Sequence, residues 1–161
     1  MNKLKLKIIL INIATTFSLA IFFITDRFLK NISLNLDPNI NLVKDFFVFS
    51  FTKNYFISFS LPLSGPVLNI FIVLMTLLLL FYLIFLILKE KEKRVEIFLL
   101  LFIFFGALSN VIDRLSLGFV IDYLELRNFS AFNLADIMIT IPSLILILKN
   151  LELIKRKTKE T

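Results

Sequence analysis

"PVLNIFIVLMTLLLLFYLIFLIL", residues 66–88, is an apolar run without a charged side chain. About 20 such residues are enough for a helix to cross the hydrocarbon core of a membrane. Three further blocks approach this length, at 8–25, 95–112 and 132–148. A soluble core would place its apolar residues at helical or strand spacing, whereas these blocks are continuous. The sequence therefore predicts an all-α membrane protein with four transmembrane helices.

The composition agrees with this interpretation. Of 161 residues, 58% are hydrophobic, above the roughly 45–50% usual for soluble domains. The lysines before the first block resemble the positively charged start of a signal peptide. Its apolar run is longer than the 7–15 residues of a signal sequence, however, and no small-residue cleavage site precedes Asp26. We interpret the first block as an uncleaved span.

The distribution of basic residues predicts the orientation. With four spans, the N-terminus, the 89–94 loop and the C-terminal tail share one side, and twelve of the 18 Lys and Arg residues fall there. By the positive-inside rule both termini and this loop are cytoplasmic. Topology explains the basic runs, so no nucleic-acid partner is predicted. The whole chain, 1–161, is expected to form one membrane domain with a small extracytoplasmic cap at 31–65.

The expected cap contains an aromatic stretch. "FFVFSFTKNYFISFSL", residues 46–61, is rich in aromatic and β-branched residues with patchy alternation. This pattern is typical of short strands or of an amphipathic element on the membrane surface. We expect a β-like cap whose aromatic side chains dock on the membrane, with contact to substrate lipid as the alternative.

The sequence has no Cys and no His. This excludes a cysteine nucleophile, a Ser-His-Asp triad, disulfides and any metal site with His or Cys ligands. Acid–base chemistry must then use carboxylates, Lys or Tyr. No metal and no cofactor are predicted.

Polar residues gather where the third and fourth blocks meet the outer side. Asn110, Asp113 and Arg114 stand at i, i+3 and i+4 and share one helical face. Asn133 and Asp136 repeat the i, i+3 spacing in the fourth block. The two polar faces are expected to meet at one depth, near the outer interface.

Two aspartates in this region have no evident structural partner. Acids inside membranes are costly and point to function. Asp113 has a neighbouring arginine, which suggests a structural ion pair, but no cation stands at helical spacing from Asp122 or Asp136. Two carboxyl groups forced together in a low-dielectric pocket share one proton. In an aspartic protease such a pair activates water and polarises the peptide carbonyl.

Five sequence blocks, in order, resemble the lipoprotein signal peptidases (signal peptidase II). They are Asp26-x-x-x-Lys30, "NYFISFS" at 54–60, "FGALSNVIDR" at 105–114, "GFVIDY" at 118–123 and "FNLAD" at 132–136. Phe56, Phe105 and Ser109 stand where the family has glycine. The resemblance implies four spans with both termini cytoplasmic.

The resemblance also implies roles for individual residues. It assigns catalysis to Asp122 and Asp136. Amide and guanidinium groups suit an extended peptide at this depth, whose N–H and C=O groups must be satisfied. The residues implied to line the substrate site, by holding the peptide backbone or the polar framework of the pocket, are Asn54, Asn110, Arg114 and Asn133. The residues expected to be structural are Asp26, Lys30, Asp113 and Gly106, with Asp26 and Lys30 as an i, i+4 pair.

The substrate implied by the resemblance is a prolipoprotein whose cysteine already carries diacylglycerol. Cleavage would occur just before that cysteine, near the outer face of the bacterial cytoplasmic (inner) membrane. The expected partners are this substrate and membrane lipid, and the expected state is a monomer.

Three alternatives to a peptidase with an aspartate pair fit the sequence less well. A proton- or ion-conducting protein would distribute acids over the full membrane depth, whereas the inner halves of the spans lack them apart from Glu96. A non-catalytic assembly subunit has no need for two unpaired aspartates. A Ser-Lys protease using Ser60 or Ser64 with Lys30 has no support from spacing.

Overall fold

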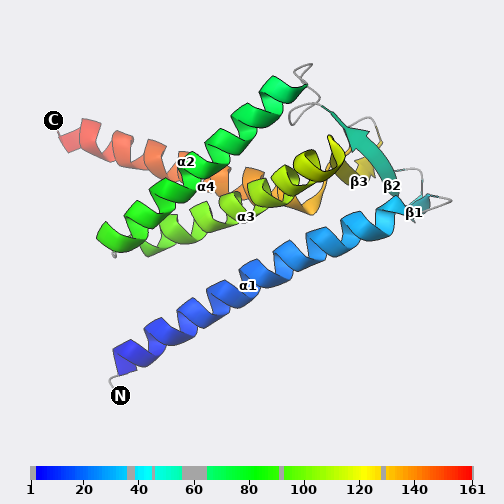
Figure 1. Cartoon of the computed structure of the whole chain (residues 1–161). Coiled ribbons are helices and arrows are strands. Elements are labelled where there is room, and N and C mark those ends of the chain that lie inside the picture. The colour runs from blue at the N-terminus through cyan, green and yellow to red at the C-terminus, as the bar shows by residue number, and fades with distance from the viewer. Residues whose placement is uncertain are drawn as a thin grey trace.

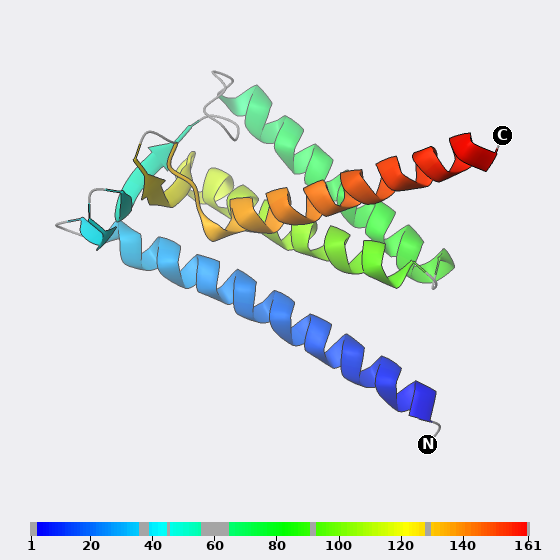
Figure 2. The same ribbon diagram turned by 180° about the vertical axis from the view of Figure 1, so that it is seen from behind.

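The computed structural model describes residues 3–35, 39–44, 46–55, 65–90, 93–127 and 130–160. Helices form one long bundle, and a small sheet closes one end of it (Figure 1). Both termini lie at the opposite end, as the view from behind confirms (Figure 2). In chain order the elements are α1 (Lys3–Leu34), β1 (Ile40–Val43), β2 (Phe47–Asn54), α2 (Pro66–Lys89), α3 (Arg94–Leu117), β3 (Val120–Leu126) and α4 (Leu134–Glu160).

Among the described residues, three helices are long and apolar enough to cross a membrane. They are α2, with a mean hydropathy of 3.2, α3, with 2.3, and α4 over Leu134–Glu152, with 1.7. These helices lie at the three apolar blocks 66–88, 95–112 and 132–148 where helices were expected. Gly118, at φ 82°, caps α3 in the left-handed conformation, and its N–H donates to the carbonyl of Arg114. Glycine is the usual residue for such a cap, because it lacks a Cβ.

α1 is longer than predicted. It is helical over Lys3–Leu34, whereas the apolar block ends at residue 25. The extension is favoured because Asp26, Lys30 and Ser33 lie on one face and are all fully buried. Those polar side chains find their partners inside the protein, so the helix continues past its apolar run. Residues 31–34, expected in the cap, therefore belong to α1.

The cap is a three-stranded antiparallel sheet in the order β1-β2-β3. β2 was predicted by its aromatic pattern, but β3, which carries Asp122, was expected as a connection. β2 pairs with β3 in the register Asn54–Val120 and Thr52–Asp122, and this register shifts between Phe49 and Thr52. Such irregularities re-aim side chains and are frequent beside active sites. Residues 56–64, the rest of the predicted aromatic segment, lie outside the described residues.

α3 is the central helix and packs against α1, α2 and α4. A Cβ built on Gly106 would lie 2.6 Å from the carbonyl oxygen of Ala135, so glycine here permits close contact between α3 and α4. Towards α1, Phe105 meets the ring of Phe23 edge to face, with centroids 5.7 Å apart. The helices thereby bring the start of α4 and the end of α3 to one place under the sheet.

Candidate active site

α4 begins with a reciprocal cap that fixes Asp136. The Asn133 Oδ1 atom accepts the backbone N–H of Asp136 at 2.9 Å, and Asp136 Oδ2 accepts the backbone N–H of Asn133 at 3.1 Å. This is the geometry of a capping box, in which two otherwise unpaired N–H groups are satisfied. Asp136 is thus held in the first helical turn, where the helix dipole favours a negative charge.

Asp122 lies in β3 and is 1% exposed. Its two carboxyl oxygens each accept a side-chain amide. Asn54 Nδ2 donates to Oδ2 at 2.8 Å, and Asn133 Nδ2 donates to Oδ1 at 2.7 Å. Asn133 therefore caps the helix that carries Asp136 and also binds Asp122, so one residue links the two carboxyl groups.

The environment of Asp122 favours a bound proton. Burial, and then the negative charge of Asp136, raise the pKa of Asp122 from 3.8 to about 7. The amides of Asn54 and Asn133 and the charge of Lys30 act in the opposite direction. A raised pKa on Asp122 beside a second carboxyl group fits a pair that holds one proton near neutral pH.

Asn110 connects Asp136 to α1. Its Nδ2 atom donates to Asp136 Oδ1 at 2.9 Å. Its Oδ1 atom accepts Lys30 Nζ at 2.8 Å and Asn133 Nδ2 at 3.3 Å. Direct hydrogen bonds thus join the polar faces of the third and fourth helices, as the sequence predicted.

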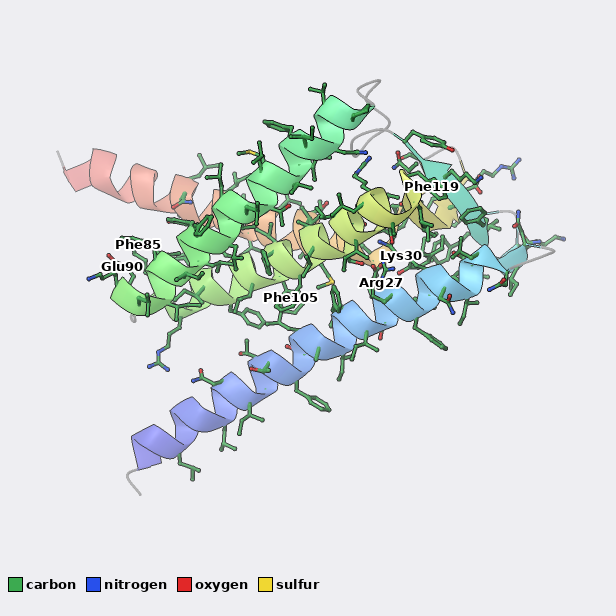
Figure 3. All side chains as sticks on the ribbon, viewed as in Figure 1. Arg27, Lys30, Phe85, Glu90, Phe105 and Phe119 are labelled. Atoms are coloured by element: carbon green, nitrogen blue, oxygen red, sulfur yellow. The ribbon has the colours of Figure 1, made fainter. Side chains whose placement is uncertain are left out.

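Asp113 is fully buried and pairs with cations of α1. It contacts Arg27 Nη1 through Oδ1 and Lys30 Nζ at 2.8 Å through Oδ2. Figure 3 labels these two cations, which reach from α1 towards α3 at the sheet end. The expectation that Asp113 pairs with Arg114 is corrected, because adjacent residues of a helix do not face each other. Asp113 Oδ2 also accepts the backbone N–H of Ile121, beside Asp122, at 3.3 Å.

Arg114 lies on another side of the site. It is 7% exposed, and its Nη1 atom donates to Asn69 Oδ1 of α2 at 3.5 Å. Its charge interacts with both Asp122 and Asp136. The guanidinium is therefore placed within electrostatic reach of the carboxyl pair.

Asp26 is the centre of a buried network that composition alone did not reveal. Its Oδ1 atom accepts Tyr123 O–H at 2.9 Å and the backbone N–H of Ala135 at 3.1 Å. Its Oδ2 atom accepts Ser109 O–H at 2.6 Å and pairs with Lys30 at 3.2 Å. The i, i+4 pair of Asp26 and Lys30 is confirmed, and through Ala135 it holds the start of α4.

Sequence reasoning missed Tyr123. The side chain is completely buried, and its hydroxyl also accepts the backbone N–H of Leu134 at 3.0 Å. Burial and the charge of Asp26 raise the pKa of this phenol, so it stays neutral and can donate. The alternation of side chains along a strand could have revealed it, because this places Tyr123 on the face opposite Asp122. The strand β3 was not predicted, however.

The donor set of the site consists of carboxylates, amides and cationic side chains. In the described part of the chain, no group of three or more Asp, Glu, His or Cys residues is arranged to hold a metal ion. Phe56, Ser60 and Ser64, named in the sequence analysis, lie outside the described residues.

Comparisons with known proteins point to one family. The model of the family described as signal peptidase (SPase) II matches residues 18–152. The lipoprotein signal peptidase of Clostridium tetani is 31% identical over 120 residues, which cover 71% of this chain and 76% of that protein. The lipoprotein signal peptidase of Halothermothrix orenii is 51% identical over 43 residues. That alignment covers 27% of this chain and only 30% of the relative's length.

The fold has a solved counterpart. A bacterial membrane enzyme determined by the in meso method superposes with a TM-score of 0.75 at 23% identity, covering 86% of this chain and 88% of that one. At this identity the likeness concerns the arrangement of helices and sheet.

Proposed function

Since this chain belongs to the signal peptidase II family, we propose that it is a membrane aspartic endopeptidase that removes signal peptides from prolipoproteins. The observation that carries the proposal is the carboxyl pair. Asp122 and Asp136 come from different elements, interact electrostatically, and are both bound by Asn133. Such a pair supplies a base and an acid without a cofactor.

The reaction needs one proton shared between the two carboxyl groups. The ionised member takes a proton from a water molecule, whose oxygen forms a bond to the scissile carbonyl carbon. The protonated member donates a hydrogen bond to the carbonyl oxygen as negative charge develops there. When the carbon–nitrogen bond breaks, the departing nitrogen takes from the pair the proton that water supplied, so the pair again holds one proton. The new C-terminus leaves as a carboxylic acid and ionises by giving its proton to solvent.

The surrounding polar residues divide between the two predicted roles. In this structure Asn54, Asn110 and Asn133 donate to the carboxyl pair, which favours the role of polar framework. Arg114 interacts electrostatically with both members of the pair, and its guanidinium suits contact with a substrate carbonyl. We therefore assign backbone binding chiefly to Arg114 and orientation of the carboxyl groups to the three asparagines.

The membrane arrangement completes the proposal. We infer that α1 is the fourth span, because apolar side chains such as Ile13 and Phe17 are exposed on it, at 59% and 67%. The chain is then one multi-pass domain of the bacterial inner membrane with both termini cytoplasmic. The sheet lies at the other end (Figure 1). Asp122 belongs to its strand β3 and Asp136 to the first turn of α4, so we infer that the carboxyl pair lies near the outer face. A cysteine carrying diacylglycerol would hold the scissile bond at that depth, just before the cysteine, and the enzyme would act as a monomer.

A gel-shift assay tests this function. Purified protein in detergent receives one prolipoprotein in two forms, with and without diacylglycerol on its cysteine. We expect cleavage of the lipid-modified form, with a new N-terminus at the cysteine by mass spectrometry, and none of the unmodified form. Folded protein that leaves the lipid-modified form intact would contradict the proposal.

The pKa of Asp122 predicts the pH dependence of cleavage. If Asp122 is the group that donates to the carbonyl, it must be protonated, and a pKa of about 7 leaves it protonated only below that value. Activity should then fall about tenfold for each pH unit above the alkaline midpoint. Initial rates between pH 5 and 9, with protein folding checked at each pH, measure this limb. A rate that keeps rising to pH 9 would contradict the assignment.

A further inference from the structure

Lys30 occupies an unusual position for a lysine. Its side chain is 1% exposed, and its ammonium group reaches four polar atoms from two helices. These atoms are Asp26 Oδ2 at 3.2 Å, Asp113 Oδ2 at 2.8 Å, Asn110 Oδ1 at 2.8 Å and Ser109 Oγ at 3.4 Å. Burying a cation is costly unless it is paired and hydrogen-bonded. The two carboxylates would satisfy that need, so the contact with Asn110 calls for its own explanation.

The contact with Lys30 determines how the amide of Asn110 is oriented. An ammonium group can only donate, and a side-chain amide has one oxygen that accepts and one nitrogen that donates. The Asn110 oxygen must therefore face Lys30, which turns the nitrogen towards Asp136 Oδ1, 2.9 Å away. Asn133 Nδ2 donates to the same oxygen at 3.3 Å and supports this orientation.

The chain from Lys30 through Asn110 makes the two catalytic carboxyl groups unequal. Asp136 accepts an amide that is polarised by a cation, and it also accepts the backbone N–H of Asn133 at a helix N-terminus. Asp122, in the described part of the chain, accepts the side-chain amides of Asn54 and Asn133. Hydrogen bonds in a series polarise one another, and donation to a carboxylate favours its charged form.

We propose that Lys30 is a positioning residue which, through Asn110, holds Asp136 as the ionised member of the carboxyl pair and leaves Asp122 to carry the proton. The inference rests on the proposed function and names which carboxyl group takes the proton from water. Asp136 is then the base, and Asp122 is the group that donates to the carbonyl oxygen. Lys30 itself touches neither the water nor the peptide.

Other charged or titratable groups lie around the carboxyl pair and its network, and they are the same in wild type and Lys30→Met. They are Asp26 and Arg27 of α1, Asp113 and Arg114 of α3, and Asp122 and Tyr123 of β3. Arg27 provides the matched control. Like Lys30 it is a cation of α1 bound to Asp113, but its hydrogen bonds go to Asp113 and to the carbonyl of Ser109. Removing Arg27 therefore takes one cation from Asp113 while the contact between Lys30 and Asn110 stays.

The first experiment does not depend on cleavage. Protein labelled with 13C-aspartate is titrated in detergent and followed by infrared spectroscopy, and Asp122→Asn and Asp136→Asn assign the carboxyl bands. At neutral pH we expect a protonated carboxyl band for Asp122 and none for Asp136. In Lys30→Met, the Asp136 band should become protonated at a pH at least about one unit higher than in wild type. In Arg27→Met it should stay where it is in wild type.

An Asp136 band that does not move in Lys30→Met, or moves as far in Arg27→Met, would overturn the proposal. If Lys30→Met does not fold, Asn110→Leu breaks the same chain at its other link and should shift the band at least as far, because it also removes the direct amide donor to Asp136. The double variant should shift it no further than Asn110→Leu alone, because Lys30 acts through that contact. An additive shift would mean that Lys30 acts independently of Asn110.

The second experiment measures the pH dependence of cleavage. In Lys30→Met the acid limb of the pH–rate profile should move to higher pH by the same amount as the infrared band. Arg27→Met should lower thermal stability and leave this acid limb at the pH of wild type. A purely structural role for Lys30 would reduce the folded fraction without moving the limb. Failure of wild type to cleave the lipid-modified substrate would count against the proposed function alone, since the infrared titration decides the role of Lys30 without substrate.

Discussion

Asp136→Asn should reduce cleavage of the lipid-modified prolipoprotein by at least about 1,000-fold, and Asp122→Asn should do the same. An amide cannot exchange a proton with water or with the departing nitrogen, so either change removes half of the chemistry. The folded structure should persist, because asparagine keeps the shape of aspartate. At position 136 its oxygen can still accept the backbone N–H of Asn133, which now binds Asp136 Oδ2 at 3.1 Å.

The measurement is the gel-shift assay on purified variants that are folded and extracted from the membrane like wild type. Glu96→Gln is the matched control, since it also converts an acid into its amide. Glu96 pairs with Lys149 at 2.8 Å, and both side chains are partly exposed. A partly exposed pair contributes little, so this variant should cleave within about twofold of wild type. Appreciable activity in Asp122→Asn or Asp136→Asn would show that the wrong residues carry the reaction.

Asp113→Asn should have the largest effect on stability. The change removes the negative charge between Arg27 and Lys30, and Lys30 is fully buried. Removing one partner of a buried ion pair costs about 3–5 kcal/mol, because the remaining charge is left uncompensated. We therefore expect low yield and a lower Tm in detergent, with cleavage per folded molecule reduced much less than by Asp136→Asn.

The double variant Asp113→Asn with Arg27→Met is the internal control. It removes one charge of each sign, and the pair of Lys30 with Asp26 at 3.2 Å remains. Part of the lost Tm should return, because fewer unpaired charges are buried. A well-folded Asp113→Asn protein without any activity would instead place Asp113 in the chemistry.

The structure shows what two side chains contact at positions where the sequence comparison expected the family's glycines. Phe105 fills the space between α3 and α1, where it meets the ring of Phe23. Ser109 adds a hydroxyl that donates to Asp26 and lies 3.4 Å from Lys30 Nζ. Both side chains therefore connect α3 to α1.

Much of the architecture followed from local properties of the sequence. The length of an apolar run that crosses a membrane is set by membrane thickness, so α2, α3 and α4 could be placed from the blocks 66–88, 95–112 and 132–148. The spacing of Asn133 and Asp136 is also local, because i, i+3 neighbours share a helical face whatever surrounds them. Asp122 and Asp136 stood out as candidates because acids in apolar surroundings are rare.

Only the tertiary structure decided which polar groups meet. Asp113 binds Arg27, 86 positions earlier, and not its neighbour in the chain. α1 continues past its apolar block, and β3 forms, because each finds partners on distant elements: Tyr123 of β3 donates to Asp26 of α1, 97 positions away. The physical reason is that the stabilisation of a buried charge or hydroxyl depends on what packs against it. The sequence by itself determined how many apolar segments there are and which acids need partners. Only helix packing decided that Lys30 binds Asn110 and that Asn110 binds Asp136, one aspartate of the pair.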